Sequence, residues 1–313
     1  MKTLLTGANG LVGSTIKADV RVMGRKPPFP GYKERNKRWL DLTRPRDVNS
    51  LFLETKPTHV IHTAAKVGGV GANINYVGDF FYENMLVNLN VLEAARKAGV
   101  SKVVSFLSTC IYPEGIEYPL CEHMLHDGEP HSSNFGYAYA KRMLEVQGRA
   151  YTEQYGMEHT CVIPTNIYGP NDNFNLDDSH VLPALIHKCY LAKKNKTDLI
   201  VWGSGKPLRE FIYSEDVGEL TQMIVEKEGG PNMVILSSGE EISIKGLVEL
   251  VVKAMKFKGT VVFDESKPDG QYKKTTSDVI SKHIFPNYKY TSLKTGIKKT
   301  VDWFLSNYED CRK

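Results

Sequence analysis

Long apolar runs, cysteine motifs and a strong excess of either charge are all absent from this sequence of 313 residues. No stretch approaches the ~20 apolar residues that a membrane-spanning helix requires, so we expect no membrane segment. Residues Met1–Gly7 lead directly into an expected strand and a glycine turn, which leaves no room for a signal or transit peptide. We therefore expect a cytoplasmic protein.

The cysteines and the charges exclude further classes of protein. Five cysteines are scattered along the chain, and no two of them form a Cys-x-x-Cys pair. This pattern supports neither a disulfide framework nor a structural zinc site, so we expect free thiols and no metal. The 40 Lys and Arg residues outnumber the 36 Asp and Glu residues, giving a net charge of +4. Such a mild bias fits a small anionic ligand better than nucleic acid, which usually requires a denser basic face, and an ordinary solvated surface explains it equally well.

The sequence does contain a regular alternation of short apolar runs and segments with helical spacing. The runs rich in β-branched residues predict strands at Lys2–Thr6, Val20–Met23, Thr58–Thr63, Val103–Leu107, Thr160–Ile163 and Met233–Leu236. The spacing of apolar residues predicts helices at Pro45–Glu54, Phe80–Ala98, Tyr137–Tyr155, Val181–Lys194, Ser214–Glu226, Ile244–Met255 and Leu293–Leu305. Such alternation predicts an α/β fold of the Rossmann type, in which a doubly wound parallel sheet carries helices on both faces. Ligands of these sheets bind at the carboxyl ends of the strands.

The second half of the sequence is less regular. Gly169–Asn173 and Gly203–Pro207 interrupt the alternation, and we predict that the chain leaves the large sheet near Asn166 and returns for only one more strand. The expected domains are therefore a Rossmann domain of residues 1–165 plus about 214–242, and a smaller, discontinuous C-terminal substrate domain of about 166–213 plus 243–313.

A glycine motif follows the first expected strand. Gly7, Gly10 and Gly13 are spaced by two residues each, and we expect a helix to begin after them. Such glycines allow a tight turn and a close approach of the backbone to a pyrophosphate, while the start of a helix favours negative charge. We therefore predict that this turn, including Asn9, Leu11 and Val12, binds a dinucleotide.

The end of the second expected strand indicates which dinucleotide is bound. An acidic residue there would bind the ribose hydroxyl of NAD, whereas basic residues accommodate the extra phosphate of NADP. Val20–Met23 is followed by Gly24, Arg25 and Lys26 without a carboxylate, which favours NADP. An alternative is that the two basic residues belong to a solvated loop. Asp41 and Leu42, after the next short strand, are expected near the adenine.

Three further residues form a set that can transfer a proton. Ser108 ends an expected strand, and Tyr137 and Lys141 lie four residues apart on one face of an expected helix. An ammonium beside a phenol stabilises the phenolate, so we expect Lys141 to lower the pKa of Tyr137 from its ordinary value of about 10. With Ser108 holding a carbonyl oxygen, the set can shuttle a proton during hydride transfer.

The glycine motif, Ser108 and the Tyr137/Lys141 pair together resemble the extended short-chain dehydrogenase/reductase family. Longer segments resemble members of that family that act on GDP-linked keto-sugars, and these segments are residues 64–69, 108–113, 134–142, 163–174, 179–184, 201–205 and 267–270. The resemblance extends from the first strand to about residue 275, although Lys17–Trp39 does not follow the family pattern. It implies an enzyme that uses NADPH to epimerise GDP-4-keto-6-deoxy-D-mannose at C3 and C5 and to reduce it at C4, giving GDP-L-fucose.

The same resemblance implies roles for individual residues. The expected catalytic residues are Ser108, Tyr137, Lys141, Cys110 and His180. The expected cofactor-binding residues are Gly7, Asn9, Gly10, Leu11, Val12, Gly13, Arg25, Lys26, Asp41, Leu42, Ala64, Ala65, Leu107, Lys141, Pro164, Asn166, Ile167 and His180. The expected substrate-binding residues are Ser108, Thr109, Asn166, Val181, Lys188, Trp202, Arg209, Asp269 and Lys274.

Chemistry gives a separate reason to favour epimerisation. Related sugar-nucleotide dehydratases carry an Asp-Glu pair after the strand-end Ser or Thr, whereas this sequence has Thr109 and Cys110 there. Epimerisation beside a 4-keto group needs one group that removes an α-proton and another that returns a proton to the opposite face. The thiol of Cys110 and the imidazole of His180 have suitable acidity, and which of them is base and which is acid is left open. Without the resemblance, Cys110 would be interpreted as a buried apolar residue and His180 as a helix cap or a surface residue.

Two alternatives and one expectation complete the prediction. The first alternative is another NAD(P)-dependent nucleotide-sugar epimerase or dehydratase of the same family. The second is a catalytically silent cofactor-binding protein, which would typically have lost the Tyr/Lys pair that this sequence keeps. By the resemblance we also expect a homodimer, in which Phe80–Ala98 and Tyr137–Tyr155 of two copies form a four-helix interface.

Overall fold

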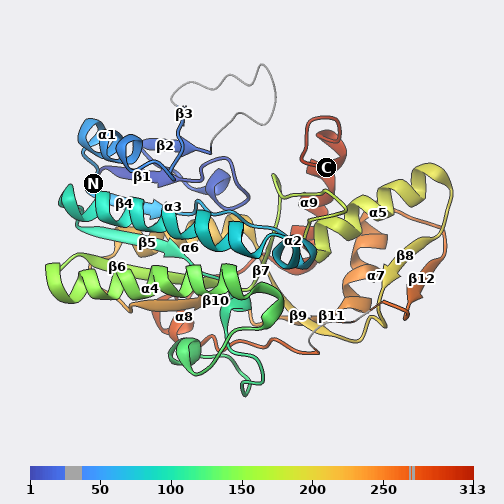
Figure 1. Ribbon diagram of the computed structural model, residues 1–313. Helices are drawn as coiled ribbons and strands as arrows, with labels where there is room; N and C mark the ends of the chain where they lie inside the picture. The colour runs from blue at the N-terminus through green and yellow to red at the C-terminus, as the bar shows by residue number, and fades with distance from the viewer. Residues whose placement is uncertain (25–36, 268, 270–271) are drawn as a thin grey trace.

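The computed structural model describes residues 1–24, 37–267, 269 and 272–313, so Arg25 and Lys26 lie outside the described residues. The described chain forms a large parallel sheet with helices on both faces, on the left of Figure 1, and a smaller body of helices and short strands on the right.

The large sheet has seven strands in the order β10-β6-β5-β4-β1-β2-β3, and every neighbouring pair is parallel. Its strands are β1 (Thr3–Thr6), β2 (Val20–Met23), β3 (Lys37–Trp39), β4 (His59–His62), β5 (Lys102–Phe106), β6 (Glu158–Pro164) and β10 (Met233–Leu236). The strand order reverses at β1, which pairs with β2 on one side and β4 on the other. The carboxyl end of β1 therefore lies at the switch point where doubly wound sheets bind ligands.

Helices cover both faces of this sheet. One layer is formed by α1 (Pro45–Thr55), α3 (Val77–Lys97) and α4 (Phe135–Tyr155), and Figure 1 shows α3 and α4 side by side along the strands. The other layer contains α6 (Ser214–Glu226) and α8 (Val279–Ile284). Val103 belongs to the apolar core under α3 and α4, whereas its chain neighbour Val104 belongs to the core under α6. Neighbouring residues of a strand point to opposite faces, so both faces of these strands must be apolar.

The smaller body has its own apolar core, formed by residues such as Phe174, Ile186, Val251 and Phe304. Its helices are α5 (Val181–Asn195), α7 (Ile244–Met255) and α9 (Leu293–Ser306). A three-stranded sheet contains β7 (Asn166–Tyr168), β9 (Leu208–Tyr213) and β11 (Glu241–Ser243), and a two-stranded sheet contains β8 (Leu199–Trp202) and β12 (Val261–Asp264). Phe285, inside the range expected for the substrate domain, packs instead in the core under α6.

The elements predicted from apolar spacing are present, and the predicted bounds of β2, α6, α7 and β10 match the structure. The remaining elements are α2 (Val70–Asn75) and the short 3-10 helices η1 (Gly13–Thr15), η2 (Thr109–Ile111), η3 (Glu122–His126) and η4 (Ser132–Asn134).

The prediction of a helix after the glycine motif is wrong. Only the three-residue η1 follows the turn, because residues 7–19 must provide the whole connection from β1 to β2. This connection is close to the minimum of about a dozen residues for a parallel crossover, which leaves little chain for a longer helix. Arg21 on β2 fastens this short connection by donating to the carbonyls of Ala8, Gly13 and Ile16, the first two at 3.0 Å. A hollow of about 440 Å³ lies beside η1, and α6 lines its other side.

Candidate active site

The glycine turn has the shape that a dinucleotide phosphate requires. Gly7 adopts φ +73°, and a Cβ on Gly13 would lie 2.1 Å from the Gly7 carbonyl oxygen, so neither position accepts a side chain. The Gly10 amide donates to Gly7 at 3.0 Å, and Asn9 is exposed at the tip of the turn. Among the described residues, the amides of Leu11 and Val12 donate to no protein acceptor. These amides, without a helix behind them, can hold phosphate oxygens at the switch point.

Residues after the neighbouring strands complete this edge of the sheet. Ala64 and Ala65 follow β4, and the Ala64 amide donates to Thr6 at 3.4 Å. Leu107 and Pro164 lie at the ends of β5 and β6, where the Leu107 amide bonds to β6. All four therefore lie at the same carboxyl edge of the sheet as the turn, and their contacts with the cofactor stay predictions.

Two predicted adenine contacts lie farther along the edge. The carboxylate of Asp41 accepts hydrogen bonds from the amide and hydroxyl of Thr43 at 3.0 and 2.6 Å. Leu42 is buried, and its carbonyl accepts from Asn90 at 2.9 Å. Whether they contact adenine stays a prediction, as does any phosphate contact of Arg25 and Lys26.

Ser108 and Cys110 form a tight unit after β5. The Ser108 hydroxyl caps η2 by accepting from the Cys110 amide at 3.4 Å, and it donates to the Cys110 sulfur at 3.2 Å. Thr109 between them is buried, whereas the free thiol of Cys110 is half-buried. A hydroxyl and a thiol thus lie in direct contact at the carboxyl edge of the sheet.

Tyr137 and Lys141 face this unit from α4. Both side chains are buried, and the Lys141 ammonium lies 5.9 Å from the centre of the Tyr137 ring. Burial lowers the pKa of Lys141 to about 8, and the ammonium donates to the carbonyl of Phe106 at 2.8 Å.

The predicted lowering of the Tyr137 pKa is wrong for the protein alone. Burial, and then the charge of Cys110, raise the pKa of Tyr137. Desolvation dominates because little of the buried side chain is accessible to the water that would hydrate a phenolate. Tyr137 is therefore held as a neutral proton donor.

Electrostatic interaction with Cys110 brings one more predicted residue, Lys274, to the site. Burial lowers the pKa of both Lys141 and Lys274, and the charge of Cys110 opposes this shift in each. His180 lies immediately before α5 and is accessible to solvent, yet protein atoms surround it closely enough to lower the pKa of its imidazole by desolvation. The position of His180 relative to Cys110 stays a prediction.

Four predicted substrate contacts surround one pocket in the smaller body. The pocket has a volume of about 160 Å³, and its lining includes Val181, Trp202, Arg209 and Asp269. Trp202 is 60% exposed, and the Lys188 ammonium lies 4.3 Å from its ring centre. An exposed aromatic face beside a cation can stack a nucleotide base.

The charged members of this pocket have protein partners. Asp269 accepts from the amide and hydroxyl of Ser204 at 2.6 and 2.7 Å, and these bonds lower the pKa of its carboxyl. Burial lowers the pKa of Arg209, which spends one N–H on the carbonyl of Leu208. Asp269 thus fixes the Gly203–Gly205 turn, while Arg209 has further donors for an anion.

Asn166 and Ile167 are mainly structural in this structure. The Asn166 amide donates to the carbonyl of Glu210 at 2.8 Å, and Ile167 packs against the core under α6. Their ligand contacts stay predictions.

Sequence reasoning missed a buried polar chain between the glycine turn and α4. Thr6 bonds to His62 at 2.7 Å, His62 bonds to Asn88 at 3.1 Å, and Asn88 donates to the carbonyl of Ala140 at 3.2 Å. Burial lowers the pKa of His62 to about 3, so the ring is neutral. The chain fixes the turn relative to the helix segment that carries Lys141. A histidine in an apolar strand and an asparagine on an apolar helix face were the available signals.

The described residues contain neither a cluster of metal ligands nor a membrane-spanning helix. No cluster of His, Cys, Asp and Glu there could hold a metal ion. None of the helices described is long and apolar enough to cross a membrane.

A doubly wound sheet with a phosphate-binding turn at its switch point and a Ser, Tyr and Lys beside it defines a dinucleotide-dependent oxidoreductase or epimerase. The family model "NAD dependent epimerase/dehydratase family" matches residues 3–236. The chain belongs to this family, which confirms the predicted fold and family.

The chain is also similar over nearly its full length to individual proteins of this class. The chain is 47% identical to the GDP-L-fucose synthase of Dictyostelium discoideum, over 99% of this chain and 97% of the relative. It is 33% identical to the GDP-L-colitose synthase of Yersinia pseudotuberculosis, over 98% of each chain. A GDP-L-fucose synthetase structure from Naegleria fowleri bound to NADP is 40% identical and superposes with a TM-score of 0.85, covering 99% of this chain and 94% of that one.

Proposed function

We propose that the protein converts GDP-4-keto-6-deoxy-D-mannose to GDP-L-fucose by epimerisation at C3 and C5 and NADPH-dependent reduction at C4. The observation that carries this proposal is the contact between the Ser108 hydroxyl and the Cys110 sulfur at 3.2 Å, beside the buried Tyr137. This contact puts a base next to the groups that would hold a keto oxygen.

In the epimerisation, Ser108 and Tyr137 hold the 4-keto oxygen and stabilise the enolate that forms there. Cys110 takes a proton first from C3 and then from C5, which leaves the electron pair of each C–H bond in the enolate. His180 returns a proton to carbon from the opposite face. Desolvation favours the neutral imidazole, so His180 must take up a proton from solvent before each return, and Cys110 must release its proton to solvent between the two removals. The assignment of Cys110 as base and His180 as acid is a hypothesis.

In the reduction, Tyr137 donates its proton to the C4 oxygen, and its raised pKa keeps the phenol protonated until the alkoxide forms there. NADPH, when bound, supplies the hydride to C4. The Gly7–Gly13 turn fits its pyrophosphate through the free amides of Leu11 and Val12. Arg25 and Lys26 are proposed to hold its 2′-phosphate, and Lys141 to orient its ribose.

The pocket beside Trp202 is proposed to bind the GDP. Trp202 and Lys188 would hold the guanine, and the remaining donors of Arg209 suit the diphosphate, because a guanidinium binds two oxygens at once. Lys274, close to both Arg209 and Cys110, would contact the part of the substrate between the diphosphate and the reacting carbons.

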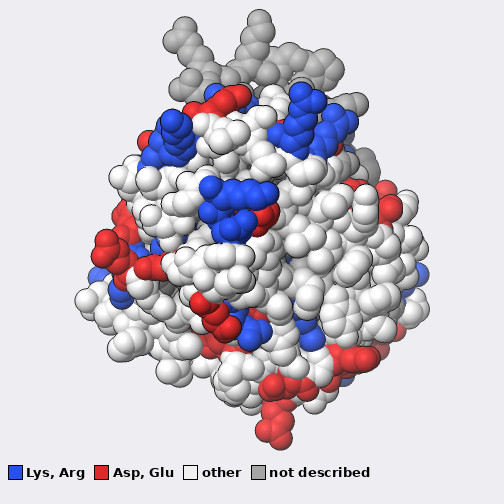
Figure 2. Space-filling view, turned by 60° about the vertical axis from the view of Figure 1, so that its left-hand side comes forward, with Lys and Arg blue, Asp and Glu red and all other residues white. Residues whose placement is uncertain are grey.

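A homodimer is part of the proposal, while a cytoplasmic location stays a prediction. Exposed apolar side chains on α3 and α4 support the four-helix interface, and these include Phe81, Tyr82, Leu89, Met143 and Tyr155. Figure 2 shows a face on which positive and negative side chains are interspersed among uncharged ones. Sedimentation of the wild-type protein and of Leu89→Lys tests this interface. The proposed homodimer predicts that wild type sediments as a dimer and Leu89→Lys as a monomer. A wild-type monomer would contradict the proposed homodimer.

The reaction is tested by incubating the purified protein with GDP-4-keto-6-deoxy-D-mannose and either NADPH or NADH, followed by product analysis. The proposal predicts GDP-L-fucose, formed faster with NADPH. Reduction without inversion would remove Cys110 and His180 from the mechanism. NADPH binding without turnover would favour the alternative of another nucleotide-sugar enzyme of this family.

A further inference from the structure

The turn that carries Cys110 is held from outside by two residues of the α4 region. The side-chain amide of Asn134, next to the start of α4, donates to the carbonyl of Cys110 at 2.9 Å. Arg142, on α4 itself, donates from Nε to the carbonyl of the next residue, Ile111, at 2.9 Å. The turn therefore has consecutive carbonyls tied to the element that carries Tyr137 and Lys141.

Arg142 is an unusual residue to hold a backbone turn in place. Its side chain is buried, and burial lowers the pKa of its guanidinium. No carboxylate pairs with it among the described residues, since its hydrogen bonds go to Ile111 and, at 2.6 Å, to the carbonyl of Gly128. Its Nη2 has no partner in the described part of the chain. Its guanidinium also lies 5.7 Å from the ring centre of Tyr139. A buried arginine whose hydrogen bonds go only to carbonyls is costly, which indicates a role in fixing backbone position.

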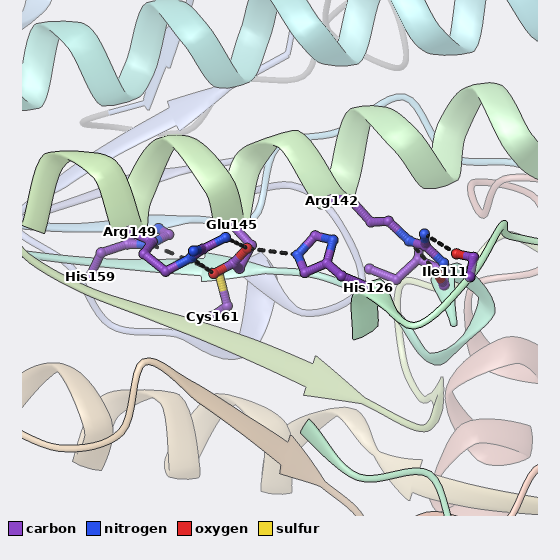
Figure 3. A network of polar contacts seen from close by, with 8 residues as sticks. Ile111, His126, Arg142, Glu145, Arg149, His159 and Cys161 are labelled. Atoms are coloured by element: carbon purple, nitrogen blue, oxygen red, sulfur yellow. Dashed lines mark hydrogen bonds and ion pairs between the residues drawn. The ribbon is translucent and has the colours of Figure 1, made fainter. Parts of the chain in front are cut away.

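Figure 3 shows how the two arginines of this part of α4 differ. Arg142 reaches toward Ile111, whereas Arg149 reaches back to Glu145, which also bonds to His126 at 2.8 Å. Glu145 and His126 thus tie α4 to η3 without contacting the Cys110 turn. Arg142 is the arginine of this network that reaches the turn.

The second bond of Arg142 extends the same support toward the substrate pocket. Gly128 belongs to the segment between β5 and α4 that also contains Leu120. The Leu120 amide donates to Thr275 at 2.9 Å, and the Leu120 carbonyl accepts from Ser277 at 2.8 Å. Lys274 directly precedes this paired stretch. The Arg142 guanidinium therefore bonds both to the turn of Cys110, at Ile111, and to the segment, at Gly128, whose Leu120 pairs with the residues after Lys274.

We propose that Arg142 is a positioning residue for epimerisation, which holds the Cys110 thiol where it can reach the C3 and C5 protons. The inference rests on the proposed function. Reduction depends less on Arg142, because Tyr137 is carried by α4 itself and Lys141 is anchored separately to Phe106. Losing Arg142 should therefore slow proton removal more than hydride transfer.

The readout is the ratio of products, which a smaller amount of folded enzyme does not change. The variants Arg142→Met and Arg142→Lys are incubated with GDP-4-keto-6-deoxy-D-mannose and NADPH in D₂O. We expect the ratio of incompletely inverted, C4-reduced sugars to GDP-L-fucose to rise at least ~10-fold in Arg142→Met, since misplacement by about 1 Å can cost ~10²-fold in rate. Deuterium incorporation at C3 and C5 should fall by a similar factor, and Arg142→Lys should be affected less.

Arg149→Met is the matched control, because it removes an arginine from the same helix and network without touching the turn. Its product ratio should stay within about twofold of wild type. Asn134→Ala, which removes the donor to Cys110 itself, should shift the ratio in the same direction and provides the test if Arg142→Met does not fold. If the folded Arg142 variants, or Asn134→Ala, gave wild-type product ratios, this inference would be overturned and the proposed function would stand. A wild-type protein that forms no GDP-L-fucose would instead overturn the proposed function and the inference with it.

Discussion

Replacing Asp172 by Asn should stabilise the protein at alkaline pH and leave it almost unchanged at acidic pH. Asp172 is buried, its Oδ1 accepts from the Asn173 amide at 2.7 Å, and its Oδ2 has no partner in the described part of the chain. Burial raises the pKa of this carboxyl from 3.8 to about 7. The native state therefore keeps a proton that the unfolded chain releases.

The sign and size of the effect follow from this difference. Between pH 3.8 and about 7 the unfolded state binds fewer protons than the native state, so stability falls as the pH rises through this window. A difference of about three in pKa, at 1.36 kcal/mol for each, gives a cost of up to ~4 kcal/mol at pH 8. Asn carries no charge, so the variant avoids this cost.

The assay is urea unfolding of wild type and Asp172→Asn at several values between pH 4 and pH 8, after refolding has been shown to be reversible. The free-energy advantage of the variant should grow steadily with pH. Asp310→Asn, at an exposed position near the same end of the smaller body, is the control and should show no such growth. An advantage of Asp172→Asn that is the same at pH 4 and pH 8 would refute the reasoning.

Three further predictions concern other groups. Burial lowers the pKa of His62 to about 3, so the stability of the protein should fall as the pH drops from 6.5 toward 3. His62→Gln should weaken this pH dependence in urea unfolding. An unchanged pH dependence would contradict a neutral, buried His62. Lys141 has a pKa lowered by burial to about 8, so the rate of reduction should decline above that pH, and a flat kcat/KM profile to pH 10 would argue against a charged Lys141 in catalysis. Gly13→Ala places a Cβ 2.1 Å from the Gly7 carbonyl oxygen and should lower the NADPH affinity, measured by calorimetry, at least ~10-fold. Gly10→Ala places a Cβ 3.3 Å from the same atom and should lower the affinity less. Equal losses of affinity would contradict the role of the close contact at Gly13.

The large sheet could be predicted because its signals are local. The strand around Ile235 is buried on both faces and is a continuous apolar run, and in β5 the neighbouring residues Val103 and Val104 are buried on opposite faces. The spacing in α6 and α7 reflects one buried face each, which is why their bounds agree with the sequence pattern. β8 and β12 were missed although Leu-Ile-Val-Trp and Val-Val-Phe are apolar runs, because each strand has only four residues and the pair forms a separate two-stranded sheet outside the strand–helix alternation.

The site was predictable where a residue type and its place after a strand are sufficient, as for Ser108 and Cys110. It was not predictable where the outcome depends on distant partners. The shortened connection to β2 relies on Arg21, and the raised pKa of Tyr137 depends on how tightly the chain buries the phenol. Arg142 gave no signal, because its importance lies in the carbonyls that it reaches and not in its own neighbours in sequence.

The central claim is that one site both exchanges the C3 and C5 protons and reduces C4. The most direct test is NMR analysis of the product formed from GDP-4-keto-6-deoxy-D-mannose and NADPH in D₂O by wild type and by Cys110→Ser. We expect GDP-L-fucose with solvent deuterium at C3 and C5 and none at C4 from wild type, and at least ~10-fold slower deuterium incorporation by Cys110→Ser. Deuterium incorporation by Cys110→Ser at the wild-type rate would contradict it.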